Sequence, residues 1–185
     1  MRPTNKIVAI LAGGKAKRFE GQDKGAIRLE DERFIDIIHR RLSAQADEIL
    51  ISGTHDYDLG LKVIPDAKDT PGGPVGGLYS IWKELSSGEL EGFFTVPVDG
   101  PNLPLNLTQR LYSQLSSTIA VDEKGRHPTY GWWRMTDLAR LFKEAHLQNS
   151  ISLNRLADKV IAKEVFWAGN NIFMNINCPG DLKEL

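Results

Sequence analysis

Cysteine is almost absent from this sequence, in which Cys178 is the only one among 185 residues. A single cysteine excludes an internal disulfide framework and a zinc cluster built on cysteines. Long apolar runs are missing as well. Residues 7–12 are too few for the core of a signal peptide, and no other stretch reaches the length of a membrane-spanning helix. We therefore expect a cytoplasmic protein with no membrane partner.

The sequence also lacks an excess of charge of one sign. It has 23 Lys and Arg against 24 Asp and Glu, and its formal net charge is −1. A general nucleic-acid-binding protein needs a basic excess, so we expect no nucleic-acid partner. The length suits one sizeable hydrophobic core. Because no internal repeat, low-complexity tract or linker is present, residues 1–185 are expected to form one domain.

Two common phosphate-binding motifs are absent. The sequence contains neither the G-x-x-x-x-G-K-[ST] pattern of a P-loop nor a G-x-G-x-x-G pattern after its first predicted strand. Instead, residues 9–25 read AILAGGKAKRFEGQDKG, in which a glycine pair follows an apolar run and basic residues come next.

This glycine pair, Gly13 and Gly14, favours an anion site. Glycines have no Cβ atom, so backbone N–H groups can approach a bound anion closely. Arg18 suits bidentate contact with an oxyanion, and Lys24 supplies a mobile positive charge that reaches the same anion. The alternative is a plain turn with solvated lysines, and the residues alone leave both interpretations open.

Short apolar runs alternate along the chain with stretches whose apolar residues recur at helical spacing. This alternation predicts an α/β sandwich with a mostly parallel sheet, and a hairpin signal near residues 121–128 adds an antiparallel strand. Strands are expected at residues 6–11, 48–52, 61–64, 92–98, 117–121, 128–133, 162–167 and 172–176. Helices are expected at residues 34–46, 78–85, 105–115, 152–159 and 179–185, and from an N-cap at Thr136 to about residue 145.

The predicted strand at residues 92–98 delivers Asp99 at its carboxyl end. Pro97 cannot donate a hydrogen bond to a neighbouring strand. Strand pairing is therefore expected to fail near this end, on the side where Asp99 lies.

Several motifs occur in order along the chain: Leu11-Ala12-Gly13-Gly14, Arg18, Asp23-Lys24, GGPVGG at residues 72–77 and PVDGPNLP at residues 97–104. This ordered set resembles the molybdenum cofactor guanylyltransferase family, the MobA type of nucleotidyltransferase. The similarity continues through HPT at residues 127–129 and NINCPGDL at residues 175–182, so it covers nearly the whole chain. The resemblance implies a three-layer Rossmann-like nucleotidyltransferase sandwich with a mostly parallel mixed sheet.

The resemblance also implies a reaction. The family transfers GMP from GTP to the terminal phosphate of molybdenum-molybdopterin, which gives molybdopterin guanine dinucleotide and pyrophosphate. GTP and a molybdopterin-type cofactor would be the substrates and Mg²⁺ the cofactor. The resemblance further implies that the protein contacts molybdenum cofactor synthesis proteins and acceptor enzymes transiently.

Matching positions carry the family's functional roles onto this sequence. The implied catalytic residues are Arg18, Lys24 and Asp99, of which Asp99 would bind the metal ion. The implied nucleotide site consists of Leu11, Ala12, Gly13, Gly14, Lys24, Asp66, Gly76, Gly77 and Asp99, with Gly73 and Pro74 in the same loop as the last two glycines. For the second substrate the implied residues are Asn175 and Asn177, and Arg155 is the nearest candidate for a basic residue.

Several of these residues also have a structural interpretation. Asp99 suits a turn before Gly100, and Asp66 suits an Asx-turn after Pro65. Asp23 is interpreted as the salt partner that keeps Lys24 oriented.

The second-substrate residues have alternatives too. Alternation along a strand would send the side chains of Asn175 and Asn177 to one face, although Asn177 also suits a helix cap. His127 either contacts a phosphate or is structural.

The sequence departs from the family pattern at some positions. Glu20 stands where the family has a glycine, and the asparagine expected after the second strand is replaced within SGTH at residues 52–55. Two other functions therefore stay open: a related nucleotidyltransferase that uses CTP or a sugar phosphate, and a non-catalytic protein that binds a nucleotide or cofactor. The LAGG opening favours GTP, because CTP-using relatives more often read L-A-A-G.

Overall fold

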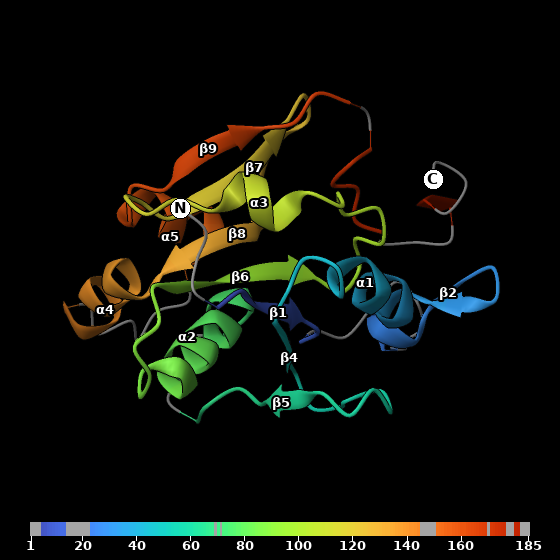
Figure 1. Ribbon diagram of the computed structural model, residues 1–185, viewed down its shortest axis with the longest axis horizontal. Coiled ribbons are helices and arrows are strands. Elements are labelled where there is room, and N and C mark those ends of the chain that lie inside the picture. The colour runs from blue at the N-terminus through green and yellow to red at the C-terminus, as the bar shows by residue number, and fades with distance from the viewer. Residues whose placement is uncertain are drawn as a thin grey trace.

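The computed structural model describes residues 5–13, 23–68, 70, 72–144, 151–169, 171–176 and 180–181. Its main feature is a seven-stranded sheet in the order β5-β4-β1-β6-β8-β7-β9, with β5 and β9 at opposite edges (Figure 1). Strand β8 runs antiparallel to its neighbours β6 and β7, and the other neighbouring strands pair in parallel. The strands are β1 (Ile7–Leu11), β4 (Glu48–Ser52), β5 (Lys62–Ile64), β6 (Gly92–Pro97), β7 (Thr118–Asp122), β8 (Gly125–Arg134) and β9 (Lys163–Phe166).

Helices cover both faces of this sheet. One face packs against α1 (Phe34–Leu42) and α3 (Leu107–Leu111), and the other against α2 (Pro74–Leu85), α4 (Met135–Glu144) and α5 (Leu153–Lys159). Strand β1 is buried on both faces. Val8 and Ile10 pack in the apolar cluster on the side of α1 and α3, and Ile7 and Ala9 pack in the cluster on the side of α2 and α5. A strand buried on both faces needs a continuous apolar run. The expected three-layer sandwich with a mostly parallel mixed sheet is confirmed.

Several helix boundaries differ from the expected ones. Helix α1 ends at Leu42 rather than at residue 46, and helix α3 begins at Leu107 rather than at residue 105. Helix α2 begins at Pro74 rather than at residue 78. Proline suits the first helical position, because an N–H group there would have no partner within the helix and the fixed φ of proline is helical. Helix α3 ends at Leu111, four residues early. Helix α4 begins at Met135, so Thr136 lies inside its first turn and is not its N-cap.

The strand expected at residues 172–176 is wrong. Residues 171–173 form a turn in which Met174 N–H donates to the carbonyl oxygen of Asn171, and Asn171 has a φ of 60°. The apolar side chains are nevertheless buried: Phe173 is 1% exposed and Ile176 is fully buried. The alternation of apolar residues at 172–176 therefore reflects burial of these side chains and not pairing with another strand. Of the helix expected at residues 179–185, only residues 180–181 lie in the described part of the chain.

The pairing of β6 fails near Pro97 on the β8 side, as predicted, but not on the β1 side. On the β1 side the register continues to the Leu11–Pro97 pair, but on the β8 side it ends at the Thr95–Gly131 pair. The register between β7 and β8 also shifts, from Ile119 opposite Gly131 to Ala120 opposite His127. Residues 128–130 of β8 therefore lie outside both ladders, at the end of the sheet that carries Asp99.

A short segment before α1 was not predicted. It consists of a 3₁₀ helix, η2 (Lys24–Ala26), and a small hairpin of β2 (Arg28–Leu29) and β3 (Glu32–Arg33). Phe34 and Ile27 anchor it through a third small cluster with Ile176. These elements are too short and too polar to show a period in the sequence.

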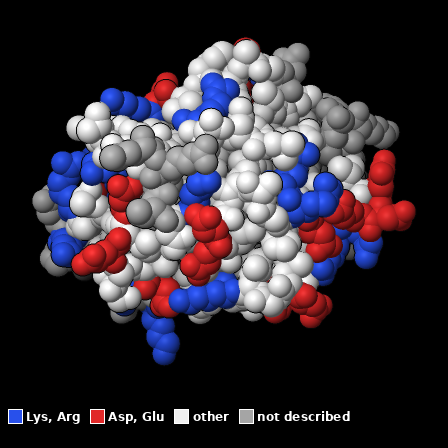
Figure 2. Space-filling model, viewed as in Figure 1, with Lys and Arg blue, Asp and Glu red and all other residues white. Residues whose placement is uncertain are grey.

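Acidic and basic side chains lie beside one another over the face shown in Figure 2, in line with the formal net charge of −1. Within the described ranges, no helix is long and apolar enough to cross a membrane.

Candidate functional site

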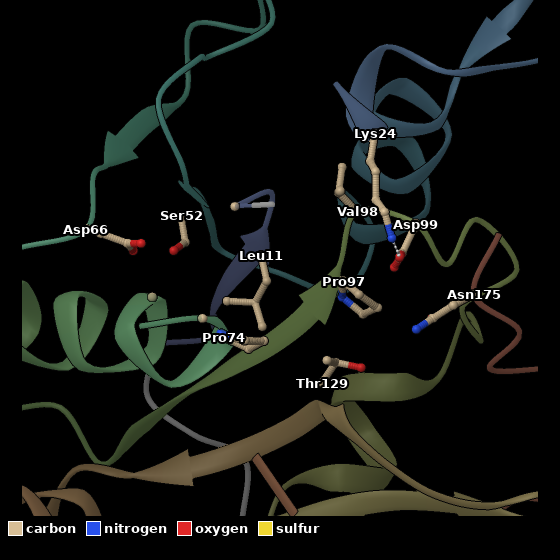
Figure 3. Close-up of a pocket in the computed structure, with 13 residues that line it drawn as sticks. Leu11, Lys24, Ser52, Asp66, Pro74, Pro97, Val98, Asp99, Thr129 and Asn175 are labelled. Carbon is tan, nitrogen blue, oxygen red and sulfur yellow. Dashed lines mark hydrogen bonds and ion pairs between the residues drawn. The ribbon is translucent and has the colours of Figure 1, made fainter. Parts of the chain in front are cut away.

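A cavity of about 550 Å³ opens where the parallel strands end (Figure 3). In a sheet of this kind, ligands bind outside the carboxyl ends of the strands. The cavity is lined by residues from the end of β1, η2, β4, the loop between β5 and α2, the first turn of α2, the end of β6, β8 and the segment after β9. They are Leu11, Gly13, Lys24, Ser52, Asp66, Gly73, Pro74, Gly77, Pro97, Val98, Asp99, Thr129 and Asn175.

The strongest charged contact in this cavity joins Lys24 and Asp99. The Lys24 ammonium lies 2.5 Å from Asp99 Oδ2, and the two side chains are 23% and 11% exposed. Figure 3 shows them meeting from η2 and from the end of β6. Because the pair is largely removed from water, its attraction is less screened than that of a surface ion pair. A cation and a carboxylate, 75 residues apart in sequence, thus share one wall of the cavity.

Asp23 orients this lysine differently from what the sequence suggested. Its carboxylate caps η2 by accepting a hydrogen bond from Gly25 N–H at 2.8 Å, and it accepts a second from the Tyr57 hydroxyl at 2.6 Å. Lys24 itself forms its ion pair with Asp99. Asp23 therefore fixes the turn from which Lys24 extends, rather than standing as the salt partner of its ammonium group.

The opposite wall carries Asp66 and Ser52, which Figure 3 shows side by side facing the start of α2. Partial burial raises the pKa of the Asp66 carboxyl above its ordinary value. In the described part of the chain, its carboxylate accepts no hydrogen bond. A cavity carboxylate of this kind is an acceptor for N–H or O–H donors of a ligand.

Glycine at position 77 lets helix α2 approach this wall. A Cβ atom there would lie 2.7 Å from Ser52 Oγ and 3.7 Å from Asp66 Oδ1. One turn earlier, Gly73 has a φ of 77°, which a side chain would disfavour. The N-terminus of α2 thereby faces the cavity with its partial positive charge. Gly76 is buried in the first turn of α2 and is not part of the lining.

The first strand brings Leu11 and Gly13 to the cavity. Ala12 between them is buried, and its N–H donates to the carbonyl oxygen of Ser52 at 2.9 Å. Gly14 and Arg18 lie outside the described residues, so their implied roles remain predictions.

Asn175 lies in the lining, and Thr129 from β8 lies beside that part of the cavity (Figure 3). Asn177 is outside the described residues. Arg155 is exposed on α5 and is not part of the cavity lining. Its backbone N–H donates a hydrogen bond to Ser152 Oγ.

His127 is held away from the cavity. Its Nε2 atom lies 2.8 Å from Asp122 Oδ1, and its ring packs on Phe173 at 5.1 Å between centroids. This geometry agrees with the structural interpretation of His127.

Sequence reasoning assigned no role to Pro97, Val98 and Thr129, which all line the cavity. Pro97 and Val98 could have been found from their place at the carboxyl end of a buried strand. Thr129 could not, because it depends on the break in the ladders of β8.

The donors in this cavity suit a magnesium ion that a ligand helps to hold. Among the described residues, no three His, Cys, Asp or Glu side chains group as a metal site. Asp99 offers one hard oxygen donor group, and Mg²⁺ is commonly bound by one or two carboxylates together with phosphate oxygens and water.

Known proteins resemble this chain in sequence and in fold. The family model described as the MobA-like NTP transferase domain matches residues 8–160. A molybdenum cofactor guanylyltransferase from Cereibacter sphaeroides is 31% identical over 182 residues, which cover 94% of this chain and 91% of the relative. One from Vibrio parahaemolyticus is 30% identical and covers 100% of this chain and 96% of the relative. The crystal structure of molybdopterin-guanine dinucleotide biosynthesis protein A from Archaeoglobus fulgidus has a TM-score of 0.73 at 17% identity, over 96% of this chain and 95% of that one.

Proposed function

The chain belongs to the family of MobA-like NTP transferase domains and is a nucleotidyltransferase, and from this premise we propose that it transfers GMP from GTP to molybdenum-molybdopterin. The products are molybdopterin guanine dinucleotide and pyrophosphate. The observation that carries the proposal is the placement of Lys24 and Asp99 on one wall of a cavity that Asp66 and Asn175 also line. Similarity to guanylyltransferases over nearly the whole chain supports it.

The reaction exchanges one phosphoanhydride bond for another. An oxygen of the molybdopterin phosphate attacks the α-phosphorus of GTP, and the bond from that phosphorus to the bridging oxygen of the β-phosphate breaks. Negative charge grows on the departing pyrophosphate. Lys24, together with Arg18, neutralises it, and the backbone N–H groups of Gly13 and Gly14 orient the phosphates.

The shape of the cavity suggests how GTP lies. The nucleoside contacts Asp66, Ser52 and Gly77, because this wall carries hydrogen-bond acceptors and a helix residue without a side chain. The triphosphate then reaches the wall that carries Lys24. The remaining side, with Asn175 and Thr129, is left for the molybdopterin phosphate.

Asp99 is the residue that would hold Mg²⁺. When bound, the ion supplies positive charge to the triphosphate. Lys24 occupies Asp99 Oδ2 in the free protein, so the lysine has to turn from the carboxylate to the phosphates when the substrate enters. Lys24 thus keeps Asp99 neutralised until a triphosphate arrives.

A thermal-shift comparison of the four nucleoside triphosphates, each with Mg²⁺, tests the choice of base. We expect GTP to raise the melting temperature most. Stabilisation by CTP without stabilisation by GTP would overturn the assignment of the base.

Release of pyrophosphate tests catalysis. We expect release only when GTP and molybdenum-molybdopterin are both present. Binding of GTP and of molybdopterin with no release would instead identify a non-catalytic cofactor-binding protein. The acceptor proteins of the product, and any molybdenum cofactor synthesis proteins that deliver the substrate, would contact the chain only transiently.

A further inference from the structure

Tyr57 reaches the turn that carries Lys24, although it comes from the loop between β4 and β5. Its hydroxyl donates a hydrogen bond of 2.6 Å to Asp23 Oδ1. The same oxygen accepts the N–H of Gly25 at 2.8 Å. A hydrogen bond to a carboxylate is among the stronger kinds in a protein. Tyr57 and the cap of η2 therefore share one acceptor, and Lys24 extends from between them.

The tyrosine ring also packs directly on this turn. A Cβ atom at position 25 would lie 2.7 Å from Tyr57 Cζ and 2.8 Å from its hydroxyl oxygen. The ring thus fits only because residue 25 is a glycine, and Gly25 is buried. Contact through both the hydroxyl and the ring fixes where η2 sits relative to the sheet.

The loop holds Tyr57 in an uncommon backbone conformation. Tyr57 has a φ of 58° and Asp58 a φ of 61°, so two consecutive non-glycine residues lie in the left-handed region. Such conformations persist only where the surroundings impose them, and they often mark functional positions. Here Arg33 Nη2 donates to the carbonyl oxygen of Tyr57 at 3.0 Å, and the Arg33 guanidinium is itself held by Asp36 at the start of α1.

We propose that Tyr57 is a positioning residue for nucleotidyl transfer: through Asp23 it sets the turn from which Lys24 reaches Asp99 and the phosphates. The inference rests on the proposed function for its consequence, but its geometric part concerns the free protein. Burial and the bond to Asp23 raise the pKa of the Tyr57 hydroxyl well above its ordinary value, so it stays a donor at every pH at which the enzyme is assayed.

The test compares Tyr57→Phe with Tyr112→Phe. Tyr112 is a matched control, because its hydroxyl also donates to a carboxylate, Glu91 Oε2 at 2.8 Å, and it lies outside the cavity lining. In the free protein, the rate at which an amine-acylating reagent modifies Lys24 is followed by peptide mass spectrometry. We expect Tyr57→Phe to raise this rate about fivefold, since a looser turn exposes the ammonium, and Tyr112→Phe to leave it unchanged.

Affinity for GTP with Mg²⁺ gives the second readout. Tyr57→Phe should weaken it about tenfold, the loss of roughly one charge-assisted hydrogen bond. In a Lys24→Met background the same substitution should change the affinity less than about twofold, because residues that act through one another are not additive. Asp23→Ala removes the acceptor of this hydrogen bond instead of the donor, so it should also raise the acylation rate of Lys24 and weaken the affinity for GTP. This variant replaces Tyr57→Phe in the test if Tyr57→Phe lowers the melting temperature strongly.

Equal acylation rates for Tyr57→Phe, Tyr112→Phe and the unaltered protein would overturn the inference. So would an undiminished effect of Tyr57→Phe in the Lys24→Met background. If the unaltered protein binds no GTP, the proposed function fails, while the acylation rates still decide whether Tyr57 positions Lys24.

Discussion

The two walls of the cavity are built from different kinds of structure. The wall proposed to contact the nucleoside, here called the nucleotide wall, consists of the ends of β1 and β4, the first turn of α2 and Asp66 in the loop after β5. Its strand ends and helix belong to hydrogen-bonded elements. The second wall, which is the side proposed for the molybdopterin phosphate, consists of Thr129, in the unpaired part of β8, and Asn175, in a segment of turn and extended chain. Asp99 lies where the two walls meet, since Ile176 N–H donates to its carbonyl oxygen at 2.8 Å.

Packing of aromatic rings replaces strand pairing in the second wall. The Phe173 ring packs against that of Tyr130 in a tilted arrangement at 4.7 Å and against that of Trp167 edge-to-face at 5.2 Å between centroids. The Tyr130 hydroxyl donates to the carbonyl oxygen of Gly100, next to Asp99. We infer that the nucleotide wall is fixed by the sheet, whereas the second wall depends on one aromatic cluster. Substitutions in each wall should therefore affect different substrates.

The largest effect on activity is expected at Asp99, where the two walls meet. Asp99→Asn keeps the size of the side chain but removes the charge that faces Lys24 and would hold Mg²⁺. The rate of pyrophosphate release should fall about a hundredfold or more, with the far-UV circular dichroism spectrum unchanged. Asp158→Asn is the control, since Asp158 pairs with Arg126 on the surface. Full activity of Asp99→Asn would remove the proposed metal site.

Gly77→Ala should break the nucleotide wall selectively. The added methyl group would lie 2.7 Å from Ser52 Oγ, inside the cavity. Overpacking there has to shift Ser52 or α2, which form the wall proposed to contact the nucleoside, and we expect the affinity for GTP to fall about tenfold in a calorimetric titration. Gly88→Ala is the matched control, because a Cβ there meets nothing closer than 3.8 Å. An unchanged affinity for GTP would show that the nucleotide does not use this wall.

Phe173→Leu should weaken the second wall, which carries Asn175, without weakening the nucleotide wall. Loss of the ring loosens the cluster that carries Asn175, at a cost of about 1 kcal/mol in the free energy of unfolding. We expect the KM for molybdenum-molybdopterin to rise severalfold while the Kd for GTP stays within about twofold. Phe142→Leu, in an aromatic cluster with Tyr79 and Trp82, controls for the stability change. Equal losses for both substrates would contradict the division into two walls.

The smallest effect concerns Asp66 and pH. Its pKa is raised by burial, so the folded protein disfavours the charged carboxylate. The contribution of this carboxyl to stability is therefore greatest below its ordinary pKa of 3.8 and declines as pH rises through its higher pKa in the folded state. Asp66→Asn should raise the melting temperature by roughly 1 °C at neutral pH, and this gain should vanish below pH 3.8. A gain that persists in acid would show that burial of charge is not its cause.

The same contrast explains what could be predicted from the sequence. Strand β4 was predicted to the residue and β1 to within one residue, because continuous apolar runs mark strands buried on both faces. Asp66 and Asp99 follow strands, so their common cavity is the expected consequence of parallel strand ends meeting at one edge. Lys24 reaches the same cavity from η2, which the sequence did not predict.

What failed depends on contacts distant in sequence. The segment at residues 171–176 has strand-like alternation, but its partner groups are aromatic rings and the carbonyl oxygen of Asp99 rather than a strand edge. The role of Asp23 was misjudged because Tyr57, its partner, is 34 residues away and no local pattern links them. Thr129 faces the cavity because two ladders end near it, which a single sequence does not reveal.

The most direct test is a crystal structure of the protein with GTP and Mg²⁺. The account predicts a triphosphate beside Lys24, a metal ion on the carboxylate of Asp99, and the guanosine against Asp66 and the start of α2. A nucleotide bound elsewhere, with the Lys24–Asp99 ion pair undisturbed, would contradict it.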